Sequence, residues 1–242
     1  MPDIALPIRI VLMQTSHPGN IGAVARAMKN MGLRELHLVQ PREFPHPEAI
    51  ARASGADDLL DSAIVHDELH SAVADCGLVI GTSARSRHIP FMPMEPRECA
   101  ELAVRKASEG NAVALLFGTE RTGLTNQELA QCGHLVTIPT SDTYSSLNIA
   151  MAVQILAYEL LLAARTHKPE IEREQPLASQ LDMERFYQHL EQVLSGTNFR
   201  DHTSSGHLMS RVRRVFNRAQ VDQNEMRILR GILSAVQEKP KA

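Results

Sequence analysis

The sequence is poor in aromatic residues and in cysteine, and both shortages narrow the classes of protein it can be. Its 242 residues include no tryptophan, and aromatic residues make up 4%, so we expect an aliphatic core. The three cysteines, Cys76, Cys99 and Cys132, are far apart and form no CxxC pair. A zinc or redox motif is therefore not expected, and we predict no metal site. An odd number of cysteines is typical of a reducing compartment.

Several enzyme motifs are also absent. No GxGxxG follows the first apolar run, so the dinucleotide fingerprint of an α/β oxidoreductase is missing. The phosphate-binding pattern GxxxxGK[ST] does not occur, which argues against hydrolysis of nucleoside triphosphates. GxSxG and HExxH are missing too, which disfavours serine hydrolases and zinc proteases of the common types.

Signals for export or membrane insertion are weak. Met1-Pro2-Asp3 does not begin the basic and then apolar pattern of a signal peptide. The longest apolar stretch, residues 150–164, is short for a membrane span and is interrupted by Gln154 and Glu159. We therefore expect a cytoplasmic protein with no membrane partner. The net charge of −3 excludes a general positive coat but not a local basic patch.

Strand-like and helix-like segments alternate along the first two-thirds of the chain. Short apolar runs occur at 8–13, 36–39, 63–65, 78–80, 112–117 and 135–138. Helical patterns occupy 21–31, 47–54, 67–75, with a cap at Asp67, 96–109 and 124–131. Continuous apolar strands are typical of a parallel sheet covered on both faces. Residues 1–165 are thus predicted to form an α/β domain with a six-stranded parallel sheet.

The composition changes after Ala164. Residues 166–180 carry two prolines and many charges, which predicts an exposed linker. Residues 181–242 show only helical patterns, at 183–194, 205–219 and 224–236, and form a small all-α C-terminal extension. Between Gly196 and Arg218, five arginines stand against a single acid, Asp201: Arg200, Arg211, Arg213, Arg214 and Arg218. Each one alone also fits a solvated helix face, but as a set they suit a nucleic-acid backbone.

Three of the predicted strands end in loops of small and hydroxyl-bearing residues, at 81–84, 118–124 and 139–148. Ligands of open α/β sheets bind beyond the carboxyl ends of the strands. The third loop contains Tyr-Ser-Ser-Leu-Asn and leads into a very apolar segment, which we expect to be helical from Ser145. Taken alone, this loop is more simply an N-cap before a core helix. Three such loops in one sheet favour a shared ligand crevice.

Arg26 is an unusual charge on the first predicted helix, because its neighbours are small and apolar. An unpaired charge is costly to bury. Such an arginine either extends its charge to solvent or is held to bind a phosphate or carboxylate.

These segments together resemble a known family. Asn20…Arg26, the run Phe-Gly-Thr-Glu-Arg-Thr-Gly-Leu at 117–124, and the region 138–150 look like the three motifs of the SPOUT superfamily of RNA methyltransferases. Among these they match the TrmH-like ribose 2′-O-methyltransferases. Residues 16–20, 81–87 and 96–99 and the helical extension are similar to one branch, the bacterial TrmJ family. Its members are tRNA (cytidine/uridine-2′-O-)-methyltransferases acting on nucleotide 32 of the anticodon loop.

The resemblance implies a fold, a cofactor and partners. The fold would be an α/β-knot, in which the C-terminal part of the sheet domain is threaded into a trefoil knot. S-adenosylmethionine would bind in the knot loops, tRNA would be the substrate, and the chain would act as a homodimer. The cofactor contacts carried over by motif are Thr82, Ser83, Ala84, Gly118, Ile138, Ser145, Ser146 and Leu147.

The resemblance also implies roles in catalysis and RNA binding. The catalytic neighbourhood would be Arg26, Asn20, Glu120, Ser146 and Asn148, with Arg26 reaching the cofactor of the other protomer. Arg85 and Arg87, which follow a cofactor loop, would join the C-terminal arginines as RNA contacts. Because aromatics are few, we expect recognition of overall tRNA shape rather than stacking on splayed bases.

Alternative functions remain open at this point. The same fold and chemistry could act on ribosomal RNA, and the helical extension argues for the tRNA branch. A catalytically silent RNA-binding protein is a second alternative, disfavoured by the intact Arg26, Glu120, Ser146 and Asn148.

Overall fold

The computed structural model describes residues 6–83, 93–166, 175–196 and 208–238. Its six strands form one sheet in the order β3-β2-β1-β5-β4-β6, and every pairing is parallel. The strands are β1 (Ile8–Met13), β2 (Glu35–Val39), β3 (Ile64–His66), β4 (Cys76–Thr82), β5 (Ala112–Phe117) and β6 (His134–Val136). The predicted six-stranded parallel α/β sheet is confirmed, whereas the trefoil knot stays a prediction.

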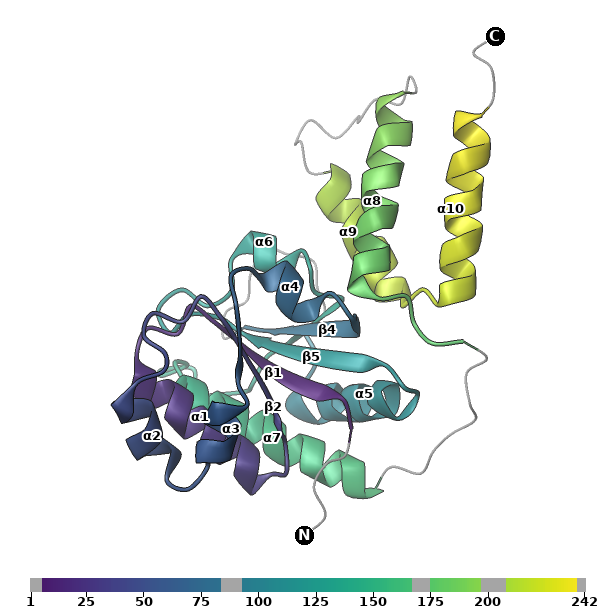
Figure 1. Cartoon of the computed structure of the whole chain (residues 1–242). Helices are drawn as coiled ribbons and strands as arrows, with labels where there is room; N and C mark the ends of the chain where they lie inside the picture. Colours follow the sequence, from purple (N-terminus) through teal and green to yellow (C-terminus); the bar gives the residue numbers. More distant parts are fainter. Residues whose placement is uncertain (1–5, 84–92, 167–174, 197–207, 239–242) are drawn as a thin grey trace.

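Helices cover both faces of the sheet (Figure 1). On one face lie α1 (Pro18–Asn30), α5 (Pro96–Ser108) and α7 (Ile149–Thr166), with α2 (Pro47–Ala53) and α3 (Asp57–Asp61) packed against α1. On the other face lie α4 (Leu69–Val73) and α6 (Asn126–Leu129). Each face buries its own aliphatic cluster, as the shortage of aromatic residues predicted.

Local chemistry explains where α1 begins and how closely it packs. Proline at the first helical position is already set to a helical φ and lacks the N–H that would be unpaired there. His17 Nδ1 accepts a hydrogen bond from the Gly19 N–H, which caps the helix. At Gly22 a Cβ atom would lie 1.9 Å from the Ala49 carbonyl oxygen, so only glycine permits this approach of α1 to α2.

Some predicted boundaries were wrong. The helix α7 begins at Ile149 rather than at Ser145, because the preceding residues form turns and an extended loop. The helix α4 begins at Leu69 after Glu68, so Asp67 is not its cap. The five-residue helix α3 had not been predicted, since one turn is too short to show a 3.6-residue period.

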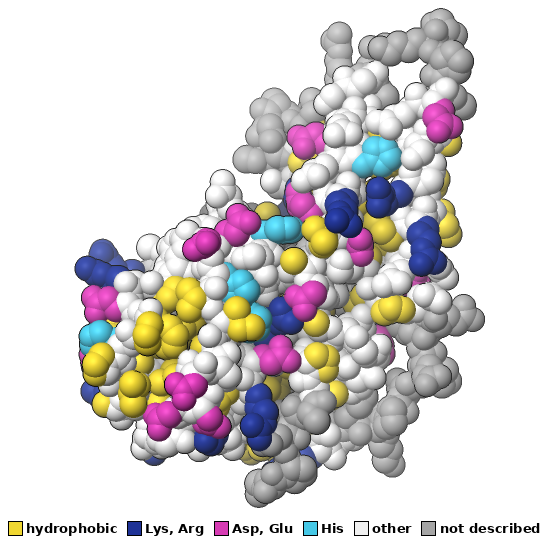
Figure 2. Space-filling model, viewed as in Figure 1, with side chains coloured by type: hydrophobic (Ala, Val, Ile, Leu, Met, Phe, Trp, Pro, Cys, Tyr) yellow, Lys and Arg dark blue, Asp and Glu magenta, His cyan; other side chains and the backbone are white. Residues whose placement is uncertain are grey.

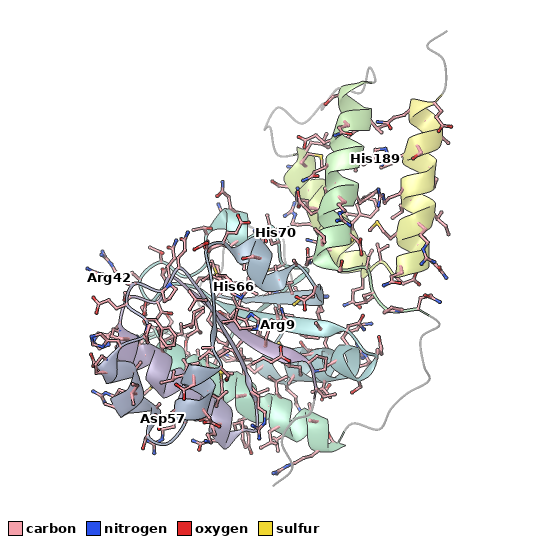
Figure 3. All side chains as sticks on the ribbon, viewed as in Figure 1. Arg9, Arg42, Asp57, His66, His70 and His189 are labelled. Atoms are coloured by element: carbon pink, nitrogen blue, oxygen red, sulfur yellow. The ribbon has the colours of Figure 1, made fainter. Side chains whose placement is uncertain are left out.

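The helical extension consists of α8 (Gln180–Ser195), α9 (Leu208–Ala219) and α10 (Gln223–Gln237) around a small core of its own. Phe186 packs edge-on against Phe216 with ring centroids 4.8 Å apart. In Figure 3 the side chain of His189 on α8 lies between α8 and α10, where its Nε2 is 3.0 Å from Gln237 Oε1. The three helices therefore form one packed unit.

The end of the predicted linker is packed, which corrects the expectation of an exposed segment over 166–180. Leu177 and Ala178 are buried, and the Leu177 N–H donates to Asn111 Oδ1 at 2.8 Å. The Leu181 N–H donates to the Ala74 carbonyl, just before β4. These contacts attach the helical unit at the amino ends of β4 and β5.

The helix α7 is the one helix of the described residues that is long and apolar enough to cross a membrane by length and composition. Helices in protein cores pass the same test, and α7 packs against α1 and α5. It buries Ile149, Val153, Leu156, Ala157, Leu160 and Ala163. This packing is that of a core helix.

Candidate active site

A cavity of about 200 Å³ opens at the carboxyl ends of β4, β5 and β6. It is bounded by the loops after these strands and by the start of α7. All the predicted cofactor contacts that the structure describes line this one cavity: Thr82, Ser83, Gly118, Ile138, Ser145, Ser146 and Leu147. Ala84 lies outside the described residues. Three loops that are distant in sequence therefore converge, as their positions after parallel strands predicted.

The lining suits a molecule that is partly apolar and partly polar. Apolar side chains that the sequence reasoning had not assigned to the cavity form part of its wall: Phe117, Val136, Ile149 and Ala152. Hydroxyl side chains from the loops after β4 and β6 also line the cavity. A flat heteroaromatic group with a polar tail, such as adenosine bearing an amino-acid chain, fits this combination of surfaces.

The loop after β5 is held in one tight shape. The Gly123 N–H donates to the Thr119 carbonyl at 2.9 Å, and the Thr119 and Thr122 hydroxyl oxygens are 2.7 Å apart. A Cβ atom at Gly118 would lie 2.1 Å from the backbone nitrogen of Leu124, so the loop closes on itself only with glycine there. This shape places Thr119 and the next four residues along the cavity wall.

Three of the predicted catalytic residues form one chain of hydrogen bonds. The Ala150 N–H donates to Asn148 Oδ1 at 2.9 Å, Asn148 Nδ2 donates to Asn20 Oδ1 at 3.0 Å, and Asn20 Nδ2 donates to Glu120 Oε1 at 2.9 Å. A backbone N–H can only donate, so the Asn148 side chain must turn its oxygen toward Ala150 and its nitrogen toward Asn20. The Asn20 side chain must then turn its nitrogen toward Glu120. The chain therefore ends on a carboxylate that must accept.

The environment of Glu120 keeps it ionised. Burial acts to raise its pKa, but hydrogen bonds from Asn20, from its own backbone N–H and from the Ser16 N–H outweigh burial. The net result is a pKa below the usual value for glutamate. Both carboxylate oxygens lie 3.2 Å from the Ser16 nitrogen. Glu120 is consequently an anion that fixes the loop after β1 to the loop after β5, and a weak base.

The remaining predicted catalytic residues differ in position. Ser146 and Glu120 line the cavity, whereas Asn20 and Asn148 form the hydrogen-bonded layer beside it. Arg26 is exposed on α1 and is not among the residues that line the cavity of its own chain. Arg121, which had not been predicted, does line it and is exposed. Within the described ranges, neither Arg26 nor Arg121 pairs with an acid.

The arginines of α9 separate into two groups by helix face. Arg211, Arg214 and Arg218 recur at three- and four-residue spacing and so share one side of the helix. Arg211 and Arg218 are exposed, and Arg214 is partly exposed. On the side facing the protein, Asn217 Nδ2 donates to the Ala130 carbonyl at 3.4 Å, which attaches α9 to the end of α6.

Arg213 points to the inside of the helical unit. Its guanidinium donates to both carboxylate oxygens of Glu184, with Nη2 2.9 Å from Oε1, and lies 4.5 Å from the centre of the Tyr187 ring. This ion pair holds the pKa of Glu184 below its usual value, against the effect of burial. The Arg213 guanidinium is thus hydrogen-bonded within the protein. A count of charges along the sequence did not predict this contact. Arg85, Arg87 and Arg200 lie outside the described residues.

Further basic side chains lie elsewhere on the helical unit. Figure 2 shows dark blue side chains over the face made by α8 and α10. On α10, Arg227 and Arg230 are exposed. No group of three His, Cys, Asp or Glu side chains is placed to hold a metal ion in the part of the chain that the structure describes.

Comparison with known proteins gives family matches over both units. The model of the SpoU rRNA Methylase family matches residues 7–158, and that of the tRNA methyltransferase TrmJ, C-terminal domain, matches residues 181–242. A tRNA (cytidine/uridine-2'-O-)-methyltransferase TrmJ of Sodalis glossinidius (strain morsitans) is 50% identical over 97% of this chain and 92% of its own length.

Solved structures agree with this result. The crystal structure of TrmJ from Z. mobilis ZM4 has a TM-score of 0.82 at 33% identity and covers 98% of this chain and 100% of its own. The SpoU methyltransferase AviRb from Streptomyces viridochromogenes, solved with the cofactor AdoMet, shares the fold at 20% identity, with a TM-score of 0.50, over 67% of this chain and 62% of its own. From the motifs, the cavity and these matches together, the chain belongs to the SpoU rRNA Methylase family, and its full-length relatives there are TrmJ methyltransferases.

Proposed function

We propose that this protein is an S-adenosylmethionine-dependent tRNA ribose 2′-O-methyltransferase that acts on cytidine or uridine at nucleotide 32 of the anticodon loop. The observation that carries the proposal is the convergence of the predicted cofactor residues on one cavity, with Glu120 and Ser146 beside them. The relatives that match over nearly the whole chain are named for this reaction on tRNA, which favours tRNA over ribosomal RNA. A cytoplasmic location follows from such a substrate.

The cofactor supplies a methyl group on a sulfonium, whose departure leaves a neutral thioether. In the reaction the 2′-oxygen forms a bond to the methyl carbon as the sulfur–methyl bond breaks, and the hydroxyl proton is lost. The protein must therefore position the hydroxyl and stabilise the negative charge that develops on its oxygen. Thr82, Gly118 and Ser145 line the cavity, and in this proposal their backbone and hydroxyl groups hold the cofactor.

Arg26 is assigned the contact to the RNA phosphate next to the reacting ribose. An arginine stays protonated, so it cannot serve as a free base, but its planar fork binds phosphate oxygens well. Glu120 is a poor proton acceptor, because its pKa is lowered and both its oxygens already accept hydrogen bonds. The hydroxyl proton then leaves through the bound phosphate or through water.

A homodimer would bring Arg26 to the cavity of the partner. Arg26 is exposed on α1, which packs directly on α7. On α7 two large apolar side chains are exposed, Met151 at 62% and Tyr158 at 49%. Such side chains are costly to leave in water and suit a second copy of the same surface.

Labelled methyl transfer to unmodified tRNA transcripts tests the reaction. Transcripts with cytidine or uridine at nucleotide 32 should gain one 2′-O-methyl group, mapped to that nucleotide. A matched transcript with a 2′-deoxynucleotide there lacks the acceptor oxygen and should gain none. Equal labelling of the deoxy transcript, or labelling of ribosomal RNA in preference to tRNA, contradicts the proposal.

The dimer is tested by mixing two inactive variants, Arg26→Ala and Ser146→Ala. If Arg26 serves the partner's cavity, half of the randomly formed dimers contain one complete site, and roughly a quarter of the wild-type activity should return. No recovery in mixed dimers, with dimer formation checked by ultracentrifugation, would place Arg26 in the cavity of its own chain.

A further inference from the structure

Tyr144 is an exposed aromatic residue in the loop between β6 and α7, next to residues that line the cavity. At 78% it is the most exposed of the large hydrophobic side chains in the described residues. The other two tyrosines differ: Tyr187 is buried in the helical unit and Tyr158 lies on α7. Tyr144 directly precedes Ser145, which lines the cavity. A ring in this position is available to whatever enters the site.

The backbone that carries Tyr144 is fixed on both sides. Before it, the Tyr144 N–H donates to the Ser141 carbonyl at 3.1 Å, and the Ser141 and Thr143 hydroxyl oxygens are 2.9 Å apart. After it, Asn148 is bonded to Asn20. The ring itself has no hydrogen bond to any described residue. The Tyr144 backbone is therefore part of a hydrogen-bonded turn, while its ring is exposed.

The proposed reaction places a nucleotide within reach of this ring. The acceptor ribose must lie beside Ser146, and its base is attached to C1′, the carbon next to the one that bears the reacting hydroxyl. Two residues of chain span at most about 7 Å, so the Cα atom of Tyr144 lies within about 7 Å of that of Ser146, a separation comparable to the size of one nucleotide. Unpaired bases of RNA loops stack on exposed aromatic side chains.

We propose that Tyr144 stacks on the base of the nucleotide whose ribose is methylated. This inference rests on the proposed function and adds the residue that holds the target base. Stacking uses the π face that every base has, so it does not distinguish cytosine from uracil. It therefore agrees with a reaction on both pyrimidines. The shortage of aromatic residues led us to expect recognition of tRNA shape rather than stacking. One exposed ring is nevertheless enough to stack on one base.

The proposal is tested by changing the ring and the base together. Wild type, Tyr144→Ala and Tyr144→Phe are compared on tRNA transcripts with either uridine or an abasic ribonucleotide at the target, the latter keeping its 2′-hydroxyl. On the uridine transcript, Tyr144→Ala should lower kcat/KM about tenfold or more, and Tyr144→Phe should stay near wild type. On the abasic transcript, wild type should fall to a similar extent and Tyr144→Ala should lose little more.

Equal relative losses for Tyr144→Ala on both transcripts overturn the proposal, because the ring then acts on something other than the base. The affinity for S-adenosylhomocysteine, measured by calorimetry, should be the same in all three proteins, and its loss in Tyr144→Ala would assign the ring to the cofactor instead. Ile64→Ala, which removes an exposed apolar side chain from the far edge strand β3, is the matched control and should leave kcat/KM unchanged. Wild type that methylates neither transcript overturns the proposed function itself.

Discussion

The buried and the exposed arginines of the sheet domain differ in their partners. At the amino end of the sheet, Arg9 is buried and donates to both oxygens of Asp75 at 2.7 Å and to the Ala72 carbonyl at 3.0 Å. Arg26 on α1 and Arg121 in the loop after β5 are exposed and pair with no acid within the described ranges. Paired arginines hold elements together, whereas unpaired ones remain available to an anion from outside. The contrast separates the charges that build the fold from those that can bind RNA.

The helical unit repeats the same contrast within one helix. Arg213 is bonded to Glu184, while Arg211, Arg214 and Arg218 lie on the opposite side of α9. The unit attaches where the strands begin, and the cavity lies where they end. The seven residues of β4 span about 20 Å between these places. An RNA that touched both would have to extend along the length of the sheet.

Removal of Arg26 should have the largest effect on activity. We expect Arg26→Ala to lower kcat by at least about a hundredfold, because in the proposed mechanism its charge stabilises the reacting oxygen and binds the neighbouring phosphate. Cofactor affinity should stay near wild type, since Arg26 does not line the cavity of its own chain. The readout is single-turnover methyl transfer to tRNA.

Arg105→Ala provides the control for that experiment. Arg105 is also exposed and unpaired among the described residues, but it lies on α5, whose carboxyl end leads into the start of β5. Its loss should leave turnover unchanged. If both variants lost the same turnover, or both kept it, the lack of an acidic partner would not by itself identify an arginine that acts in the reaction.

The two groups of arginines on α9 should have different phenotypes. Replacing Arg211, Arg214 and Arg218 together by alanine should weaken tRNA binding and lower the slope of log affinity against log salt by about two to three, without a change in Tm. Arg213→Ala should instead lower stability by about 1 kcal/mol, after allowance for partial solvent screening, because Glu184 is left without its partner.

Fluorescence titration of labelled tRNA at several salt concentrations, with thermal melts of each variant, measures both effects. A salt slope that falls as much for Arg213→Ala as for the triple variant would mean that the ion pair with Glu184 opens when RNA binds.

The last expected effect is on stability alone and concerns two histidines, of which His37 is buried and His66 is partly exposed. The His37 and His66 rings stack with centroids 5.1 Å apart, and His37 Nδ1 lies 2.9 Å from His66 Nε2. Burial, with the charges of Arg9 and His66, lowers the pKa of His37 to about 4. In Figure 3 the labels of His66 and Arg9 lie near the middle of the sheet domain, whereas Arg42 lies at its left-hand margin.

The sign of the resulting pH dependence follows from linkage. Between pH 6.5 and about 4 the unfolded chain binds a proton at residue 37 and the folded chain does not, so stability falls as the pH is lowered through this window. A shift of this size corresponds to at most about 3 kcal/mol. Urea unfolding at pH 7 and pH 4.5 should show a smaller difference in His37→Gln than in wild type. Equal differences would mean that carboxylates alone cause the acid sensitivity.

The sequence predicted best those features that depend on local pattern. The bounds of β1 and β5 agreed with the prediction, because largely apolar runs, broken in β1 only by Arg9, lie between turn-forming residues. The cavity was predicted because parallel strands bring their carboxyl ends to one edge. The hydrogen bond between Asn20 and Asn148 joins residues 128 apart, and no local pattern encodes it.

The inward position of Arg213 could have been predicted from the sequence, although we did not predict it. Met209 precedes it by four residues and Phe216 follows it by three, so helical spacing puts all three on one side of α9. Counting charges along the chain ignores this phase and therefore does not distinguish Arg213 from the exposed arginines of the same helix. The partner of Arg9, by contrast, is 66 residues away, and only the folded sheet reveals it.

The hydrogen-bond chain from Ala150 to Glu120 links the start of a helix to the charge of a carboxylate in the site. The side-chain oxygen of Asn148 accepts from the Ala150 N–H in the first turn of α7. The amide nitrogen of the same side chain donates to Asn20. The start of α7 and the carboxylate of Glu120 are therefore joined through two amide side chains. A change of charge at Glu120 would thus act on the first turn of α7 as well as on the site.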